Sequence, residues 1–196
     1  ATLLLPNDRL LLSAKEPDTD LQGLRLTEKR IAASDAWSGK KICEIPPDTD
    51  RLIAQSLARF LPDLPEPPVL LRTASGKPFF EGGFPQLGVT HSDSVVIIAL
   101  ADTPFGIDCE DRERRVKHRD ALCKRFFSTA EQAFVKNAGA EEEKTRLFLE
   151  LWVKKEAYVK YTGEGLKALA AVDTTTLSGR FENRSDEQHI LYIYYP

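Results

Sequence analysis

The chain has 196 residues, of which 42% are hydrophobic and 29% are charged, a composition typical of a globular protein with one substantial core or two small subdomains. The formal net charge of −3 gives no electrostatic case for nucleic acid as a partner. No apolar run approaches the roughly 20 residues that span a membrane, so no membrane association is expected.

The start of the chain and its cysteines both bear on the compartment. The opening ATLLLPNDRLLL lacks the cationic start of a signal peptide, and we do not expect one. The three cysteines, Cys43, Cys109 and Cys123, are odd in number and far apart in the sequence. Such cysteines are typical of free thiols in a reducing compartment, which predicts a cytoplasmic protein.

Apolar periodicity predicts a mixture of helices and strands. The first helix is expected over residues 51–60, RLIAQSLARF, and two segments rich in proline and glycine follow it. Further helices are expected at residues 119–127, from the capping-box pattern Ser128-x-x-Glu131 onward, and from about residue 141 to 161. Strands are expected at residues 86–91, 94–100, 105–110 and near 189–195. The pattern indicates an α+β fold.

The stretch FGIDCED, residues 105–111, places two carboxylates on one face of a predicted strand. Side chains alternate along a strand, so Asp108 and Glu110 point the same way. Two like charges this close repel each other unless a positive charge lies between them. From these residues alone, a solvated strand end remains an alternative.

The helix expected near LELWVKKEAYVKYTGEGL, residues 149–166, carries a lysine within its apolar stripe. That stripe contains Phe148, Leu151, Trp152 and Val159. Lys155 falls inside the stripe, so it either snorkels to solvent or lines a polar cleft. Glu156 lies beside the stripe and Lys160 lies one turn beyond it, a spacing that also fits an ordinary surface ion pair.

Three carboxylates without a nearby histidine or cysteine suit a hard, oxygen-seeking cation. Mg²⁺ prefers a few carboxylates together with phosphate oxygens and water. Lysines beside such an ion would bind the remaining phosphate charge. The set therefore predicts chemistry on a pyrophosphate.

The two motifs together resemble a known signature pair. GIDCE at residues 106–110 and WVKKEAYVK at residues 152–160 are similar to G-[IV]-D-x-E and W-x-x-K-E-A-x-x-K of the 4′-phosphopantetheinyl transferase family. Three other segments also resemble that family, namely GKP at 76–78, THSDS at 90–94 and CKRFFSTAE at 123–131. In THSDS, Thr90 replaces the usual serine and Asp93 replaces the usual glycine.

This resemblance covers roughly residues 70–166, and the chain length is similar to the longer, surfactin-synthetase-activating branch. It implies a pseudo-dimer of two similar subdomains, each a small antiparallel sheet packed with helices. Residues 1–104 would form the N-terminal subdomain that contacts coenzyme A phosphates. Residues 105–196 would carry the metal site and the catalytic helix, with coenzyme A bound between the halves.

The implied reaction moves 4′-phosphopantetheine from coenzyme A to a serine of an apo acyl or peptidyl carrier protein, depends on Mg²⁺ and releases 3′,5′-ADP. The resemblance implies that Mg²⁺ is bound by Asp108, Glu110 and Glu156. Glu156, or a metal-bound water that it orients, would be the general base, and Lys160 would stabilise charge on the leaving group. The implied contacts to coenzyme A phosphates are Arg51, Lys77, His91, Lys155 and Lys160. A solvated Arg51, a plain turn lysine at Lys77 and a structural His91 remain the simpler alternatives.

The partner of the implied enzyme is an acidic carrier protein, for which residues 112–125, RERRVKHRDALCKR, offer seven basic side chains. Because Glu113 and Asp120 interrupt this segment, a solvated charged helix is the alternative. A monomer is expected. A non-catalytic module that binds coenzyme A or a carrier, and a Mg²⁺-dependent nuclease, remain rival functions. The nuclease pattern has its Glu and Lys two residues apart on a strand, whereas here they are four apart on a helix.

Overall fold

The computed structural model describes residues 8–12, 25–30, 49–64, 68–74 and 76–196, with side chains from residue 49 onward. The chain divides into two compact units, residues 1–104 and residues 105–196. Cys109 and Cys123 are buried thiols, whereas Cys43 lies outside the described residues. No helix in the described part of the chain is long and apolar enough to cross a membrane.

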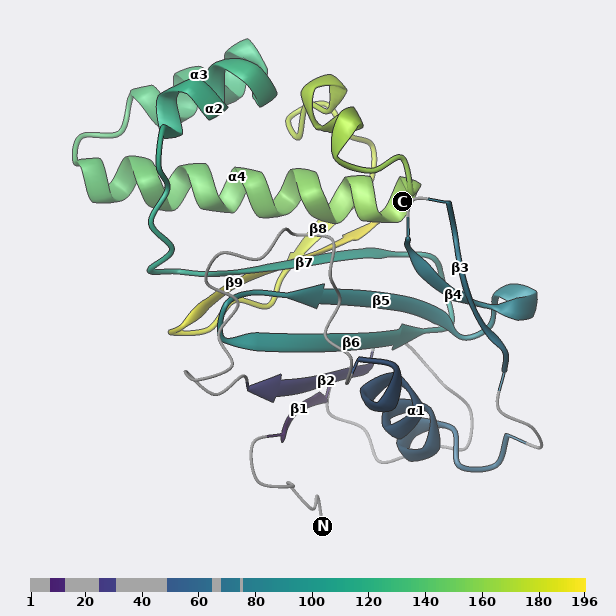
Figure 1. Cartoon of the computed structure of the whole chain (residues 1–196). Helices are drawn as coiled ribbons and strands as arrows, with labels where there is room; N and C mark the ends of the chain where they lie inside the picture. Colours follow the sequence, from purple (N-terminus) through teal and green to yellow (C-terminus); the bar gives the residue numbers. More distant parts are fainter. Residues whose placement is uncertain (1–7, 13–24, 31–48, 65–67, 75) are drawn as a thin grey trace. The chain divides into compact units, whose positions relative to one another are not determined.

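The first unit combines a four-stranded antiparallel sheet, a helix and a small hairpin (Figure 1). The sheet has the strand order β1-β2-β6-β5, and β3 pairs with β4 in a separate two-stranded sheet. The elements are β1 (Asp8–Leu12), β2 (Arg25–Arg30), α1 (Thr49–Phe60), β3 (Leu70–Arg72), β4 (Pro78–Phe80), the 3₁₀ turn η2 (Glu81–Gly83), β5 (Gln86–His91) and β6 (Val95–Ala101).

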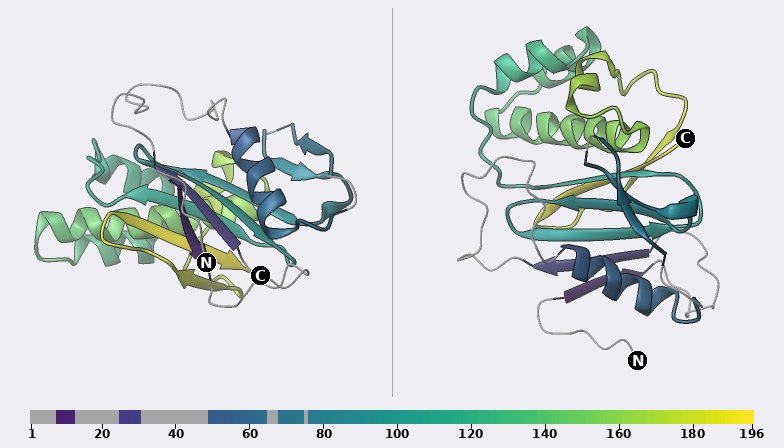
Figure 2. Two further views of the ribbon diagram at one scale, coloured as in Figure 1. Left: turned by 90° about the horizontal axis from the view of Figure 1, so that it is seen from below. Right: turned by 45° about the vertical axis from the view of Figure 1, so that its right-hand side comes forward.

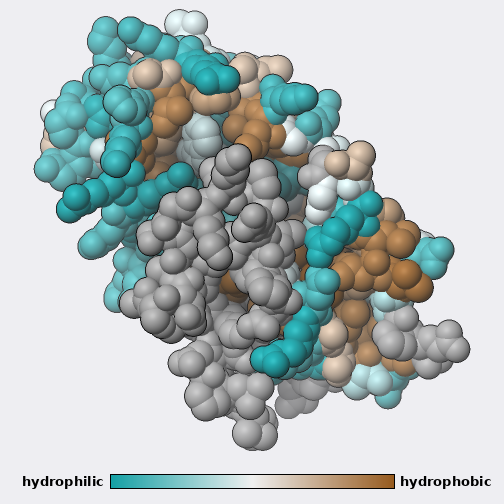
Figure 3. Space-filling view, viewed as in Figure 1, coloured by the Kyte–Doolittle hydropathy of each residue, from teal (hydrophilic) through white to brown (hydrophobic). Residues whose placement is uncertain are grey.

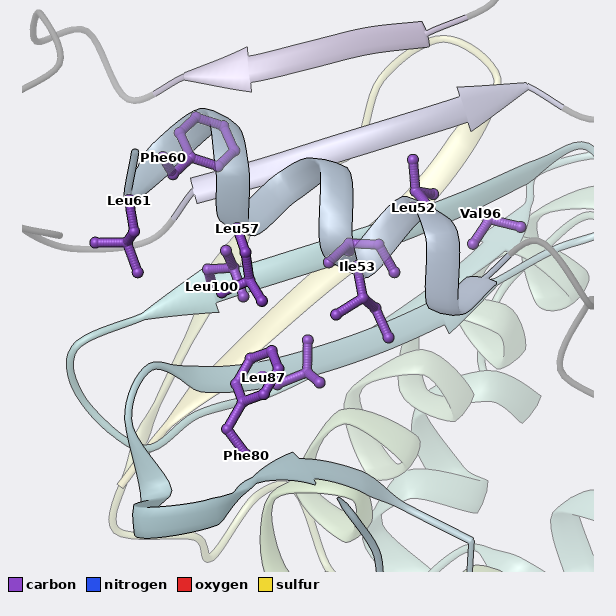
Figure 4. Close-up of a cluster of buried hydrophobic side chains, with 10 residues drawn as sticks. Leu52, Ile53, Leu57, Phe60, Leu61, Phe80, Leu87, Val96 and Leu100 are labelled. Atoms are coloured by element: carbon purple, nitrogen blue, oxygen red, sulfur yellow. The ribbon is translucent and has the colours of Figure 1, made fainter. Parts of the chain in front are cut away.

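The core of this unit forms where α1 packs against β6, as Figure 4 shows. Leu52, Ile53 and Leu57 lie on the buried side of α1, where they join a cluster with Val96 and Leu100 of β6. All seven residues of β6 are buried, as its continuous apolar run predicts. Other apolar side chains remain at the surface around β3 and β4 (Figure 3), namely Val69, Leu71, Phe79 and Phe84.

The second unit is a three-stranded antiparallel sheet covered by one long helix. Its strand order is β7-β9-β8, and α4 packs across β7 and β9. Figures 1 and 2 show α2 and α3 on the side of α4 that faces away from the strands. The elements are β7 (Gly106–Asp111), α2 (Arg119–Phe126), α3 (Thr129–Lys136), α4 (Glu141–Thr162), the 3₁₀ turn η3 (Leu166–Ala171), β8 (Arg180–Asn183) and β9 (His189–Tyr195).

Local sequence explains where the helices of this unit begin and end. The Ser128 hydroxyl accepts a hydrogen bond from the Glu131 amide at 3.2 Å, and the Glu131 carboxylate accepts one from the Ser128 amide at 2.8 Å. The predicted capping box is therefore confirmed and starts α3. Gly163 ends α4 in the left-handed region, with φ of 76°, a conformation that glycine adopts without steric cost.

The fold class predicted from the sequence is confirmed, because both units combine helices with small antiparallel sheets. The units are not copies of one another in detail. Among the described residues, the first has a 12-residue helix and a four-stranded sheet, and the second has a 22-residue helix and a three-stranded sheet. Their relation as halves of a pseudo-dimer stays a prediction.

Candidate active site

A glycine at the start of β7 allows this strand to lie directly against α4. A Cβ atom on Gly106 would lie 1.9 Å from the carbonyl oxygen of Ala157 and 2.7 Å from the amide nitrogen of Tyr161. These are backbone atoms of α4, so no side-chain movement could make room for it. Because the side chains of a strand alternate, Asp108 and Glu110 share the face of Gly106 and so point towards the helix.

The strand and the helix bring together the acidic and basic residues predicted from the two motifs. The Lys160 ammonium donates to Asp108 Oδ1 at 2.6 Å. Asp108 is buried, with 3% of its surface exposed, while Lys160 and Glu156 are half-buried. Burial lowers the pKa of Lys160, but the fields of Asp108, Glu156 and Glu110 outweigh it and raise the pKa overall. Lys160 therefore remains an ammonium inside the cluster.

Asp108 lies close enough to Glu110 and Glu156 to oppose the ionisation of both. Burial, together with the charges of Asp108 and Glu156, raises the pKa of Glu110 to about 8. Burial and the charge of Asp108 likewise raise the pKa of Glu156 well above that of an ordinary carboxyl. Arg114 and Lys160 act in the opposite direction on both groups. The predicted clustering of three carboxylates with a lysine is thus present in the second unit.

Trp152 has a polar role that the sequence did not suggest. Its ring packs as predicted, stacked on Phe148 at 5.7 Å between ring centroids and edge-on to Phe126 at 5.5 Å. Its indole N–H also acts on the Glu156 carboxylate and lowers the pKa of that group. The spacing of four residues between Trp152 and Glu156, which places both on one helix face, is the signal that could have indicated this contact.

The predicted ligands are not arranged as a metal site. Across residues 49–64, 68–74 and 76–196, no three side chains of the types His, Cys, Asp and Glu converge in a group that could hold a metal ion. The carboxylates are instead paired with cations of the chain, Lys160 on Asp108 and Arg114 on Glu110. The donor set has the chemistry that Mg²⁺ prefers, but its present geometry does not match a bound ion.

The prediction that Lys155 contacts a phosphate is wrong. Its side chain is fully buried, and its ammonium donates to Glu131 Oε2 at 2.7 Å and to the Val172 carbonyl. The ammonium also lies 5.4 Å from the centre of the Phe127 ring. A lysine in the apolar stripe of α4 is tolerated here because α3 supplies a buried carboxylate, so it neither snorkels nor lines a cleft.

The other predicted phosphate contacts belong to the first unit. Arg51 is exposed on α1, and His91 is the last residue of β5. Lys77 lies in the β3–β4 turn, where the Thr73 amide donates to its carbonyl at 2.9 Å and its own amide donates to the Thr73 hydroxyl at 3.0 Å. Burial lowers the pKa of Lys77. The turn itself is formed as expected, with Gly76 at φ 87°, and contact of these residues with phosphate remains a prediction.

The seven basic residues of segment 112–125 differ in where they point. Three are engaged with the second unit itself: Arg112 donates to the Asp186 carbonyl, Arg114 to Glu110, and Arg119 to Glu141 and Thr145. The four that are exposed are Arg115, Lys117, Lys124 and Arg125. The segment is therefore neither wholly a docking surface nor wholly a solvated helix.

Comparison with known proteins gives consistent matches. Residues 104–192 match the family model described as the 4′-phosphopantetheinyl transferase superfamily. The chain is 32% identical over 117 residues to the 4′-phosphopantetheinyl transferase gsp of Aneurinibacillus migulanus. The aligned residues make up 59% of this chain and 46% of gsp. It is 32% identical over 121 residues to AcpT of Salmonella typhimurium, covering 61% of this chain and 60% of AcpT. With Sfp of Bacillus subtilis it shares 36% identity over 78 residues, covering 40% of this chain and 33% of Sfp. The chain thus covers less than two thirds of each of these relatives.

Proposed function

We propose, from the match of residues 104–192 to the 4′-phosphopantetheinyl transferase superfamily, that the chain transfers 4′-phosphopantetheine from coenzyme A to a serine of an apo carrier protein. The other product is 3′,5′-ADP. The observation that carries this proposal is the partly buried cluster of Asp108, Glu110, Glu156 and Lys160 between β7 and α4. The family match suggests the reaction, and the cluster supplies groups suited to it.

Two residues of the cluster would act on the reacting groups. The raised pKa of Glu156 lets its carboxylate accept a proton near neutral pH, as a general base for the serine hydroxyl requires. Lys160 keeps its positive charge in the cluster and would stabilise the negative charge that develops on the leaving phosphate. The indole of Trp152 partly offsets the rise in the pKa of Glu156. Lys155 has no place among these groups because it is fully enclosed.

A requirement for Mg²⁺ is part of this proposal, with Asp108, Glu110 and Glu156 as its ligands. Bound there, the ion would supply positive charge to the pyrophosphate of coenzyme A. The proposal rests on the donor chemistry of three carboxylates, and binding would require these side chains to leave their present partners.

The remaining parts of the proposal concern coenzyme A and the setting of the enzyme. Arg51, Lys77 and His91 of the first unit would contact coenzyme A phosphates, so the two units would have different tasks. The carrier would be acidic and would dock against exposed basic side chains of segment 112–125. A cytoplasmic, monomeric enzyme is proposed, and the buried thiols of Cys109 and Cys123 are consistent with that compartment.

The direct test incubates the full chain with a panel of apo carrier proteins from fatty-acid, polyketide and peptide synthesis. We expect the mass of at least one carrier to rise by one phosphopantetheine group, with release of 3′,5′-ADP, only when coenzyme A and Mg²⁺ are both present. Two variants make the test specific. Glu156→Gln removes the proposed base with little change in shape, whereas Glu142→Gln changes an exposed carboxylate of the same helix.

The expected loss of kcat in Glu156→Gln is about 10²-fold or more, the range typical of general-base catalysis. Glu142→Gln should transfer at the rate of the unaltered chain. Binding of coenzyme A without a mass change on any carrier would refute the transferase and leave a binding module. Equal rates in the two variants would refute the role of Glu156.

A further inference from the structure

A sharp turn after β7 folds an arginine back onto one of the carboxylates of the site. The Arg114 amide donates to the carbonyl of Asp111 at 3.0 Å, which closes a turn directly after the strand. The Arg112 amide still donates to the Gln188 carbonyl at 2.9 Å, so the strand pairing holds the start of this turn in place. As a result, the Arg114 guanidinium reaches Glu110, four residues earlier, and forms an ion pair with Glu110 Oε1.

This ion pair occupies a group that metal binding would need. A divalent cation that used Glu110 Oε1 would have to displace the guanidinium. One that used the other oxygen would lie within a few ångströms of a like charge. An arginine keeps its charge at any pH that the protein tolerates, so Arg114 can yield only by moving.

The two cations of the cluster have similar exposure, 35% for Lys160 and 38% for Arg114, but differ in the element that carries them and in the burial of their partners. Lys160 extends from α4, and its partner Asp108 has only 4% of its side chain exposed. Arg114 lies on a turn and has 38% of its side chain exposed, against 15% for Glu110. Rotation about the side-chain bonds of Arg114 would therefore free Glu110 without disturbing the helix or the strand.

We propose that Arg114 is a resident counter-ion, meaning a cation of the chain that pairs with Glu110 until a divalent metal ion displaces it. In the metal-free chain its charge favours the ionised form of Glu110, and on metal binding it swings towards solvent. Arg114 thereby lowers the apparent affinity of the site for metal. This inference rests on the proposed function only in taking Glu110 as a metal ligand.

The test measures binding of Mn²⁺ alone to the full chain, without coenzyme A or carrier, by electron paramagnetic resonance of the unbound ion. Arg114→Gln removes the counter-ion. The matched control Arg115→Gln removes the same charge one residue later, from an exposed side chain. We expect Arg114→Gln to bind Mn²⁺ about tenfold more tightly, which corresponds to about 1.4 kcal/mol. Arg115→Gln should change the affinity by less than about twofold, because solvent and salt screen an exposed charge.

A second measurement compares melting temperatures in the presence of a chelator and of Mn²⁺. With the chelator, Arg114→Gln should melt below Arg115→Gln, because Glu110 then faces Asp108 and Glu156 without its guanidinium. Mn²⁺ should raise the melting temperature of Arg114→Gln more than that of the unaltered chain. Arg114→Lys keeps the positive charge but loses the planar fork of the guanidinium. Its affinity for Mn²⁺ and its melting temperatures should therefore lie between those of the unaltered chain and those of Arg114→Gln.

Several results would overturn the inference. Equal tightening in Arg114→Gln and Arg115→Gln would reduce the effect to general electrostatics, and weaker binding in Arg114→Gln would make Arg114 a support of the metal site. Absence of Mn²⁺ binding in every variant would also refute it, since removal of the counter-ion would then expose no site. Transfer activity plays no part in these measurements. Transfer with an unchanged metal affinity would refute this inference alone, and the expected affinities without transfer would refute the proposed function alone.

Discussion

At Gly106 the missing side chain determines how closely β7 approaches α4, and this can be tested by adding one carbon atom. In Gly106→Ala the new Cβ would meet the backbone of α4 at 1.9 Å, so strand and helix must move apart. Overpacking of a core typically costs 1–3 kcal/mol, and a backbone obstacle places this case at about 3 kcal/mol or more. Chemical denaturation should show this loss in the free energy of unfolding.

A second glycine provides the control. Gly139 has no atom within 4 Å of the position of an added Cβ and no positive φ. Gly139→Ala should therefore change stability by no more than about 0.5 kcal/mol, as for an ordinary surface substitution. Similar stabilities for the two variants would contradict the close approach of β7 to α4.

At the level of single residues, the sequence indicated the chemistry of the site but not all of its partners. Alternation along the strand correctly placed Asp108 and Glu110 on one face, because that depends on backbone geometry alone. The pairing of Arg114 with Glu110 depends on a turn, and that of Lys155 with Glu131 depends on how two helices pack. Neither leaves a periodic pattern in the sequence.

At the level of elements, long periodic segments were predictable and short ones were not. The strands expected at 86–91 and near 189–195 correspond to β5 and β9, and the helix expected from about 141 to 161 corresponds to α4. The sequence did not indicate β1, β2, β3, β4 or β8. The strands β3 and β4 have three residues each, too few for an alternating pattern, and β2 reads RLTEKR, in which charged residues outnumber apolar ones.

The contact between α3 and α4 depends on the buried pair of Glu131 and Lys155, which yields a prediction at this scale. Lys155→Met should lower the free energy of unfolding by about 3 kcal/mol, near the lower end for breaking a buried ion pair. The lower end is expected because Glu131 keeps hydrogen bonds from the Ser128 amide and from the amide and hydroxyl of Thr174.

A double substitution separates this ion pair from loss of packing. Glu131→Gln combined with Lys155→Met should cost less than the sum of the single changes, since no charge is then left buried alone. The control Lys154→Met removes a half-buried neighbour that lies 4.7 Å from the centre of the Tyr192 ring and should cost about 1 kcal/mol. If Lys155→Met instead folded normally and raised only the KM for coenzyme A, Lys155 would be a phosphate contact after all.

At the scale of the whole molecule, the residues proposed for different tasks lie in different units of the chain. The second unit alone contains the carboxylate cluster, its lysine and the basic segment 112–125. The first unit contains Arg51, Lys77 and His91, whose roles depend on coenzyme A. The family resemblance implied this division of residues, and the relation of the two units as a pseudo-dimer stays a prediction.

Docking of an acidic carrier should depend on the outward-pointing members of segment 112–125 rather than on all seven basic residues. Arg115→Glu combined with Lys124→Glu reverses two exposed charges. Each exposed charge contributes about 1 kcal/mol or less to the free energy of carrier binding. We therefore expect the KM for carrier to rise about tenfold at low salt when two such charges are reversed. The KM for coenzyme A should stay the same, and high salt should reduce the difference in KM for carrier because it screens exposed charges.

The control Arg59→Glu with Lys136→Glu makes the same change in net charge at exposed positions outside the segment. An equal rise in the control would show that net charge alone governs the encounter, and an unchanged KM for carrier in the first variant would assign the segment to solvent.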